Sequence, residues 1–167
     1  YKNTIEFILK KFFHIIFLIA IANFCVAQPK LDWVTTSTIG ASKDVVEDVF
    51  VDAAGNSYAC GSFTGSLKIG ATTHNAGSTT QAFVVKYDAA GAVLWSSVST
   101  GDDKAYAHTI HVDDLGCVYI AGHHTSTTTT FGTLIITTIA NEELFIVKFT
   151  PSGVPIRAMG NDLTNNG

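Results

Sequence analysis

The sequence predicts an all-β protein in which an export signal precedes two tandem copies of one repeat of about 62 residues. Two apolar segments recur in the same order at nearly constant spacing. Short runs of alternating apolar and polar residues, rich in β-branched types, predict strands, and Asp-x-x-Gly tetrads between them predict tight turns. Beyond residue 27 no window carries a long apolar period of 3.6 residues, so helix is expected to be nearly absent there.

The first 27 residues have the layout of a secretory signal peptide. Three lysines lie among the first eleven residues, and an apolar run covers residues 12–27. Cys25 and Ala27 place small side chains at positions −3 and −1 of a cut after Ala27. The run is shorter than the ~20 apolar residues of a membrane span. We therefore expect a cleaved signal and no stable membrane span afterwards; an uncleaved anchor and a lipoprotein signal using Cys25 stay open as alternatives.

Loss of residues 1–27 makes the chain acidic. It removes three lysines and Glu6, which leaves seven Lys and Arg against thirteen Asp and Glu, a formal net charge of −6. No basic stripe is present. Nucleic acid and anionic membrane surfaces are therefore not expected as partners.

The internal repeat rests on two pairs of matching segments. Residues 51–61 match residues 112–122 at an offset of 61, sharing Val, Asp, Gly, Tyr and Gly in order. Residues 82–91 match residues 144–153 at an offset of 62. Two glycines and two tryptophans also recur 62 apart: Gly70 with Gly132, and Trp33 with Trp95. The order and spacing indicate a duplicated unit with one insertion between residues 122 and 132.

Eight strands are expected, four in each repeat: 45–52, 57–63, 81–87 and 92–98, then 107–112, 118–123, 143–149 and 155–159. A connection rich in Gly, Ser and Thr joins the second strand of each repeat to the third. Residues 67–70 and 131–135 are candidates for a short extra strand there. Residues 125–130 form a polar low-complexity run, which is expected to be an exposed loop without a binding role.

Four antiparallel strands in a tandem unit of this length are typical of a β-propeller blade, which buries its faces by stacking on neighbouring blades. The interpretation divides the chain into a signal peptide, a lead-in segment around Trp33, two blades and the start of a third: residues 1–27, 28–44, 45–99, 100–160 and 161–167. A propeller has about 4–8 blades, and two alone leave open edges. The chain is therefore expected to be the N-terminal part of a larger propeller, whose further blades are its partners.

The blade pattern resembles the bacterial β-propeller repeat family known as SBBP. The stretches that carry the resemblance are residues 51–61, 63–65 and 82–95. The second repeat departs from the pattern where Cys117 replaces Asn, Thr150 replaces Asp and Arg157 replaces Trp. The resemblance spans about residues 33–160 and implies a secreted or surface protein of a Gram-negative, Bacteroidetes-like bacterium, often with a C-terminal sorting domain. It implies no catalytic residue, because the shared motif is structural.

Two groups of residues are of types that bind metal ions, but neither group supplies the full number of ligands. Each Asp-x-x-Gly turn offers one carboxylate, whereas Ca²⁺ takes about six to eight oxygens, so an Asp-stabilised turn is the favoured interpretation. Four histidines fall in one expected hairpin, where His108 should lie roughly opposite His123: His108, His111, His123 and His124. Zinc needs about three or four ligands, and no Cys or carboxylate completes the set. The histidines are interpreted as exposed polar strand positions, and no metal site is assigned.

Catalytic chemistry has no supporting motif. The G-x-S-x-G nucleophile pattern is absent. The acidic pairs at residues 102–103 and 142–143 are sequence neighbours, whose carboxylates point apart in an extended chain. No catalytic residue and no cofactor is assigned.

Two other residue types have a structural interpretation as well. Trp33 and Trp95 have the chemistry to stack on sugars, but their position in the repeat favours packing between blades. Cys60 and Cys117 occupy non-equivalent repeat positions, so half-buried apolar residues are favoured over a disulfide.

The leading interpretation is an exported, non-catalytic β-propeller repeat protein that acts as an extracellular or cell-surface interaction or adhesion scaffold for a protein or carbohydrate ligand. Export through the Sec pathway is expected, with the periplasm as the alternative compartment. Two functions stay open beside it. One is a secreted propeller enzyme of the lyase or glycosidase type with its site in other blades; the other is a structural spacer ahead of a C-terminal sorting domain.

Export makes the first testable prediction. Expressed with its leader in a Gram-negative host, the protein should be recovered outside the cytoplasm with Gln28 as its first residue, as intact-mass spectrometry can show. Ala27→Leu should leave the leader attached, because signal cleavage requires a small residue at position −1. Cytoplasmic wild-type protein that retains residues 1–27 would contradict the prediction.

Overall fold

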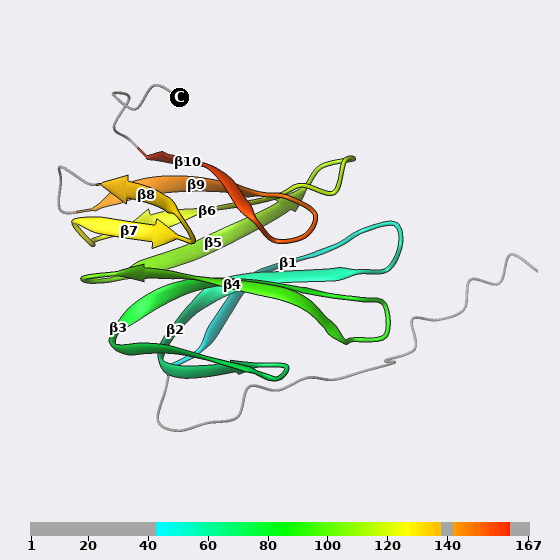
Figure 1. Ribbon diagram of the computed structural model, residues 1–167, viewed down its shortest axis with the longest axis horizontal. Helices are drawn as coiled ribbons and strands as arrows, with labels where there is room; N and C mark the ends of the chain where they lie inside the picture. The colour runs from blue at the N-terminus through cyan, green and yellow to red at the C-terminus, as the bar shows by residue number, and fades with distance from the viewer. Residues whose placement is uncertain (1–42, 138–141, 161–167) are drawn as a thin grey trace, which may run out of the picture. The chain divides into compact units, whose positions relative to one another are not determined.

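The computed structural model describes residues 43–137 and 142–160, and within these ranges the chain is all-β, without helix (Figure 1). The predicted all-β class is confirmed. Ten strands are described: β1 (Val45–Val51), β2 (Ser57–Ile69), β3 (Thr72–Tyr87), β4 (Val93–Gly101), β5 (Ala105–Val112), β6 (Val118–His124), β7 (Thr128–Phe131), β8 (Leu134–Thr137), β9 (Glu143–Phe149) and β10 (Pro155–Gly160). Every strand pair is antiparallel. The expected signal peptide, Trp33 and the expected start of a third repeat lie outside the described residues.

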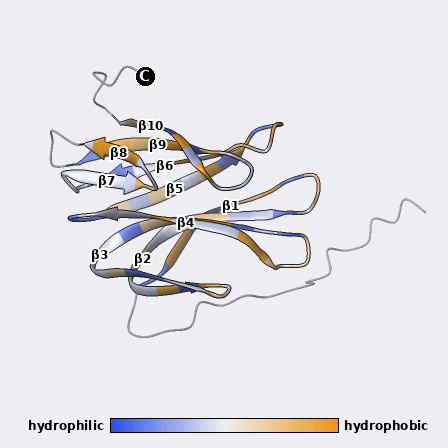
Figure 2. Cartoon of the chain, in the orientation of Figure 1, coloured by the Kyte–Doolittle hydropathy of each residue, from blue (hydrophilic) through white to orange (hydrophobic). Residues whose placement is uncertain are grey.

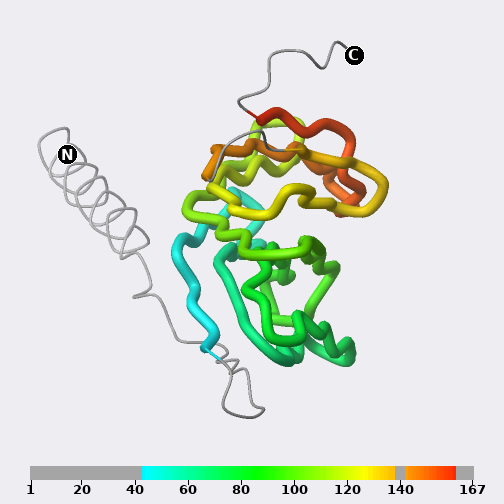
Figure 3. The backbone as a smooth tube through the Cα atoms, turned by 90° about the vertical axis from the view of Figure 1, so that its left-hand side faces the viewer, coloured from blue at the N-terminus to red at the C-terminus, as the bar shows by residue number. Residues whose placement is uncertain are grey.

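Two four-stranded meanders carry the repeat. Strands β1, β2, β3 and β4 are neighbours in chain order and continue through β7 and β8 into one six-stranded sheet; the four strands β1 to β4 are called the first sheet here. Strands β5, β6, β9 and β10 are neighbours in this order in a four-stranded sheet, which is called the second sheet (Figures 1 and 3). The register also recurs. Val46 pairs with Gly61 in the first sheet, as Ala107 pairs with Gly122 in the second, both at the repeat offset of 61. The offset found in the sequence is thus also an offset in strand pairing.

The connections between the second and third strands are more regular than the sequence suggested. In the first repeat β2 and β3 run on as one long hairpin to its turn at Gly70, with register shifts at Gly65. In the second repeat the corresponding hairpin is separate: β7 and β8 pair with each other, and β7 also pairs with β4. The candidate strand at residues 67–70 is found as the end of β2, up to Ile69. The candidate at residues 131–135 is wrong as a single strand, because these residues contain the turn between β7 and β8.

The prediction of an exposed loop at residues 125–130 is wrong. Thr128–Phe131 is strand β7, and Ser126 and Thr129 are fully buried. Thr129 stands 62 residues after Leu67, a buried residue at the same place in the first repeat. Threonine is β-branched and fits a pleated, buried strand when its hydroxyl finds a partner, which composition alone does not reveal.

Apolar segments recur along the strands of both sheets (Figure 2), and the strand register places apolar residues on both faces of each sheet. One face is called the trailing face and is marked in the first sheet by Tyr58, Cys60, Ala82 and Val84 and in the second by Tyr119, Ala121, Leu144 and Ile146. The opposite, leading face is marked in the first sheet by Val49, Phe63, Phe83 and Val85 and in the second by Ile110, His124, Phe145 and Val147. Each residue of the second sheet lies 61 or 62 positions after its counterpart.

The main core lies between the two sheets. The trailing face of the first sheet and the leading face of the second belong to one buried cluster, which includes Val84, Ile110 and Phe145. Strand β5 contacts β1, β2 and β3 of the first sheet. A second, smaller cluster lies on the leading face of the first sheet, where Leu67 and Ile69 of the β2 extension cover Phe83. The repeats therefore share a core, with the trailing face of one against the leading face of the next.

A β-bulge near the start of each sheet depends on a glycine opposite it. The register of β1 and β2 shifts between Val46 and Asp48, and the register of β5 and β6 shifts at the equivalent place. A Cβ at Gly61 would lie 1.9 Å from the carbonyl oxygen of Val45, and one at Gly122 would lie 1.8 Å from that of Tyr106. The bulged strand thus approaches its neighbour so closely that only glycine fits.

Alanine at these glycines should destabilise the fold. We expect Gly61→Ala and Gly122→Ala each to lower the free energy of unfolding by about 2–4 kcal/mol, because backbone must move to admit the methyl group. The control is Gly77→Ala, where no atom lies within 4 Å of the added Cβ and only the positive φ of 63° opposes it; its cost should be about 1 kcal/mol. Urea unfolding of the three variants measures the difference, and equal costs would contradict the account.

Candidate binding face

The trailing face of the second sheet is apolar and exposed. Leu144 and Ile146 on β9 are 63% and 46% exposed, and Met159 on β10 is 51% exposed. Their counterparts in the first sheet, Ala82 and Val84, are fully buried by the second sheet. Within the described residues nothing covers the second sheet in the same way, so this apolar surface faces solvent and is a candidate for contact with a partner.

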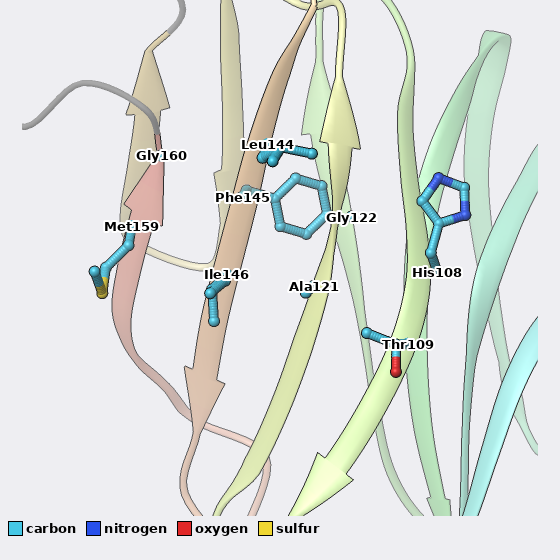
Figure 4. A pocket seen from close by; sticks show the side chains of 9 residues that line it. All are labelled: His108, Thr109, Ala121, Gly122, Leu144, Phe145, Ile146, Met159 and Gly160. Carbon is cyan, nitrogen blue, oxygen red and sulfur yellow. The ribbon is translucent and has the colours of Figure 1, made fainter.

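A hollow of about 410 Å³ lies on this face and has a mostly apolar wall (Figure 4). Strands β5, β6, β9 and β10 line it with His108, Thr109, Ala121, Gly122, Leu144, Phe145, Ile146, Met159 and Gly160. Gly122, the glycine that the bulge requires, is among the residues that line the hollow.

His108, which lines this hollow, is in contact with a second histidine of the hairpin, His123. His108 Nε2 lies 2.8 Å from His123 Nδ1, so one ring donates a hydrogen bond to the other. The Tyr106 ring stacks on His123 at a centroid distance of 4.8 Å. Glu142 Oε1 lies 3.6 Å from His123 Nε2. The expected proximity of His108 and His123 is confirmed, although Tyr106 rather than His108 is the residue that pairs with His123 in the strand register.

The other two histidines lie elsewhere. His111 packs edge-on against Phe50 at 5.6 Å, and His124 is fully buried on the leading face. His124 Nδ1 lies 3.1 Å from the Ser126 carbonyl oxygen and 3.0 Å from the Thr129 hydroxyl oxygen. The interpretation of His124 as exposed is therefore wrong. In residues 43–137 and 142–160 no group of three or more His, Cys, Asp or Glu is arranged to hold a metal ion.

The Asp-x-x-Gly turns are stabilised by their own aspartates, as expected. Asp52 Oδ1 accepts hydrogen bonds from the amides of Ala54 and Asn56, at 3.0 and 2.9 Å, and Gly55 closes the turn with a φ of 83°. Asp52 Oδ2 accepts a 3.0 Å hydrogen bond from the Tyr58 hydroxyl. Partial desolvation raises the pKa of Asp52, but hydrogen bonds outweigh it and hold the pKa below its ordinary value. Its carboxylate oxygens are thus occupied by the turn.

The turn of the second repeat reproduces this arrangement. Asp113 accepts hydrogen bonds from the amides of Leu115 and Cys117 and, at 3.0 Å, from the Tyr119 hydroxyl. Lys148 lies over the Tyr119 ring at 4.7 Å, as Lys86 lies over the Tyr58 ring at 5.0 Å in the first repeat. The repeated Asp, Tyr and Lys therefore form one structural unit that joins the β-turn to the third strand.

The carboxylates of the two acidic pairs differ in their surroundings. Asp102 accepts a hydrogen bond from Thr127, and Asp103 Oδ2 accepts one from the Thr125 hydroxyl at 2.9 Å. Both carboxylates thus hold the segment between β6 and β7. In the second pair Glu143 is buried, whereas the Glu142 side chain is 65% exposed.

The cysteines and Trp95 have packing roles. Cys60 and Cys117 are both free thiols, and burial raises the pKa of Cys60 to about 12, which removes thiolate chemistry near neutral pH. Trp95 stacks on Phe149 of the second sheet at a centroid distance of 6.1 Å and donates a 3.0 Å hydrogen bond to the Pro151 carbonyl. The expected packing of Trp95 between the repeats is confirmed.

Comparisons with known proteins leave the family open. No protein-family model matches the chain, and no curated protein sequence matches it. Within the described ranges no helix is both long enough and apolar enough to span a bilayer. The resemblance to the SBBP repeat thus stays a prediction.

Sequence reasoning missed the exposed trailing face, although a signal for it exists. Residues 82–85 and 144–147 are each four consecutive apolar residues, a pattern of strands buried on both faces. The first run is entirely buried, whereas the second alternates between buried and exposed. The continuous apolar run at residues 144–147 was therefore the sign in the sequence that both faces of this strand are apolar.

Acid should destabilise the protein through His124. Desolvation lowers the pKa of His124 below its ordinary 6.5, outweighing the hydrogen bond to Ser126. The neutral ring is therefore favoured in the fold, and stability present above pH 6.5 is lost as pH falls below it. We expect a loss of about 1 kcal/mol from pH 7 to 5.5. His124→Phe, which installs the residue of the first repeat at Phe63, should remove most of this loss.

Urea unfolding at a series of pH values measures the slope. A smaller slope should persist in the variant, because burial also lowers the pKa of His74. An unchanged slope in His124→Phe would contradict the assignment, whatever the variant does to stability at pH 7.

Proposed function

We propose that the two sheets are adjacent blades of a β-propeller and that the protein is an exported, non-catalytic scaffold for extracellular interactions. The observation that carries the proposal is the contact between the repeats. The trailing face of the first sheet packs on the leading face of the second, so each blade uses two different surfaces. A contact of this kind adds further units in the same direction, as radial stacking of blades requires.

Polar contacts support the same direction of stacking. Asp48, at the bulge of β1, accepts hydrogen bonds at 2.9 Å from the Thr109 hydroxyl and from the Ile110 amide of β5. Asp48 and Thr109 occupy the same position in successive repeats. These hydrogen bonds hold the pKa of Asp48 below its ordinary value. The first strands of the two sheets are therefore linked at equivalent points, as the inner strands of neighbouring blades would be.

The scaffold role is supported by the contacts of the polar side chains, which form hydrogen bonds within the protein itself. The turn aspartates, the acidic pair at Asp102 and Asp103, and the buried His124 all hold backbone or neighbouring loops. The predicted signal peptide, and the acidic chain that its cleavage would leave, support the proposal of a soluble exported protein. Ligand contacts of such a scaffold would come from its rim loops, as an analogy with other propellers suggests.

A third repeat tests the proposal. A second copy of residues 100–160, fused after Gly160, should dock its leading face on Leu144 and Ile146. We expect one cooperative unfolding transition and a free energy of unfolding higher by about 2–5 kcal/mol, since a new sheet-to-sheet core is buried. The matched control carries lysine in place of the isoleucine equivalent to Ile110 in the added copy, which should abolish the gain. Independent unfolding of the third repeat would contradict the stacking.

A further inference from the structure

The protein presents two exposed surfaces that correspond to the two sides of its internal contact. On the first sheet the β1 residues Val46, Val49 and Val51 are 60%, 64% and 61% exposed. Their counterparts on β5 are Ala107, Ile110 and Val112, which are buried against the first sheet. Within residues 43–137 and 142–160, the outer leading face therefore has the residues of a docking strand and no surface packed against them.

The second exposed surface is the trailing face of the second sheet. It carries the counterparts of the residues that receive β5 inside the protein: Ala121, Leu144 and Ile146 in place of Cys60, Ala82 and Val84. The hollow of about 410 Å³ lies on this surface (Figure 4). The hollow lies at the position on the second sheet that β5 occupies on the first sheet. A strand with apolar residues like those of β5 would therefore fit it.

We propose that a second copy of this chain docks its β1 strand in this hollow. Val49 of the second copy then takes the place that Ile110 takes within the chain, against Ala121, Leu144 and Ile146. The inference rests on the proposed stacking of blades, because it uses the same contact between molecules that the proposed function uses within one. Among the described residues no segment packs on Leu144 and Ile146, so the second copy would supply an apolar wall to the hollow.

The geometry makes this association directional. The two docking surfaces are different, so the contact is heterologous and leaves one leading and one trailing face free on every dimer. Growth continues until a ring closes or a chain of molecules forms. Association should therefore rise with concentration and should not stop at a symmetric dimer.

Two single substitutions separate the surfaces. Val49→Lys blocks the leading face and Ile146→Lys blocks the trailing face, and both sites are exposed, so the fold should be kept, as circular dichroism can verify. Sedimentation velocity of the exported wild-type chain should show association. Each variant alone should be weakened about 100-fold or more, since docking would bury an unpaired ammonium. Leu115→Lys, in the β5–β6 turn away from both faces, is the control and should associate like the wild type.

An equimolar mixture of the two variants is the decisive sample. Each variant keeps the surface that the other has lost, so the mixture should form a 1:1 dimer that does not grow. A monomeric wild type, continued association of either variant alone, or a mixture that stays monomeric would each overturn the inference. None of these results bears on the fused third repeat, whose unfolding tests the proposed function separately.

Discussion

The structure depends on one constraint: each four-stranded sheet of the repeat has apolar residues on both of its faces. The extension of β2 covers part of the first sheet's leading face, around Phe83, but it leaves the valines of β1 exposed. Full burial of both faces therefore needs a neighbour on each side. The contact of β5 with the first sheet meets this need once and buries Val84 and Ile110 in a single core. The same need remains at Val49 on one side and Ile146 on the other.

Two local features of the repeat, the β-bulge and the Asp-x-x-Gly turn, support the packing of one sheet on the next. The bulge opposite Gly61 and Gly122 sets the twist and position of the first strand, which carries the residues that dock on the preceding sheet. The Asp-x-x-Gly turns fix the hairpin register, so that Tyr58 and its neighbours on alternate positions face the next sheet. Because both devices recur with the repeat, the two sheets present equivalent surfaces, and a contact made once can be made again.

Much of the fold could be predicted because its signals are local. The turn chemistry at Asp52 and the alternation in the strands depend on neighbours in sequence, and the offset of 61 or 62 residues fixed which strands correspond. The strand and the buried side chains within residues 125–130 could not be predicted from local signals of this kind. Their burial comes from the pairing of β7 with β4, a contact between segments about 30 residues apart. His124 was misjudged for the same reason, since its partners Ser126 and Thr129 are placed by that pairing.

The candidate binding face was less predictable than the fold. The hairpin alone was enough to place His108 near His123. The apolar run at residues 144–147 signals that both faces of the strand are apolar, but the exposure of Leu144 depends on which other segments pack on the sheet. Its meaning appears only when the face is compared with the covered face of the first sheet. The internal repeat makes this comparison possible, because the first sheet shows how the equivalent face is covered.

The central claim is that the trailing face of the first sheet is in direct contact with the leading face of the second. A double-mutant cycle of Trp95→Leu and Phe149→Leu measures it most directly, because these rings stack across the contact. The account predicts a coupling free energy of about 0.5–1.5 kcal/mol in urea unfolding. Single-mutant effects that add to within about 0.3 kcal/mol would show that the two rings do not touch and would contradict it.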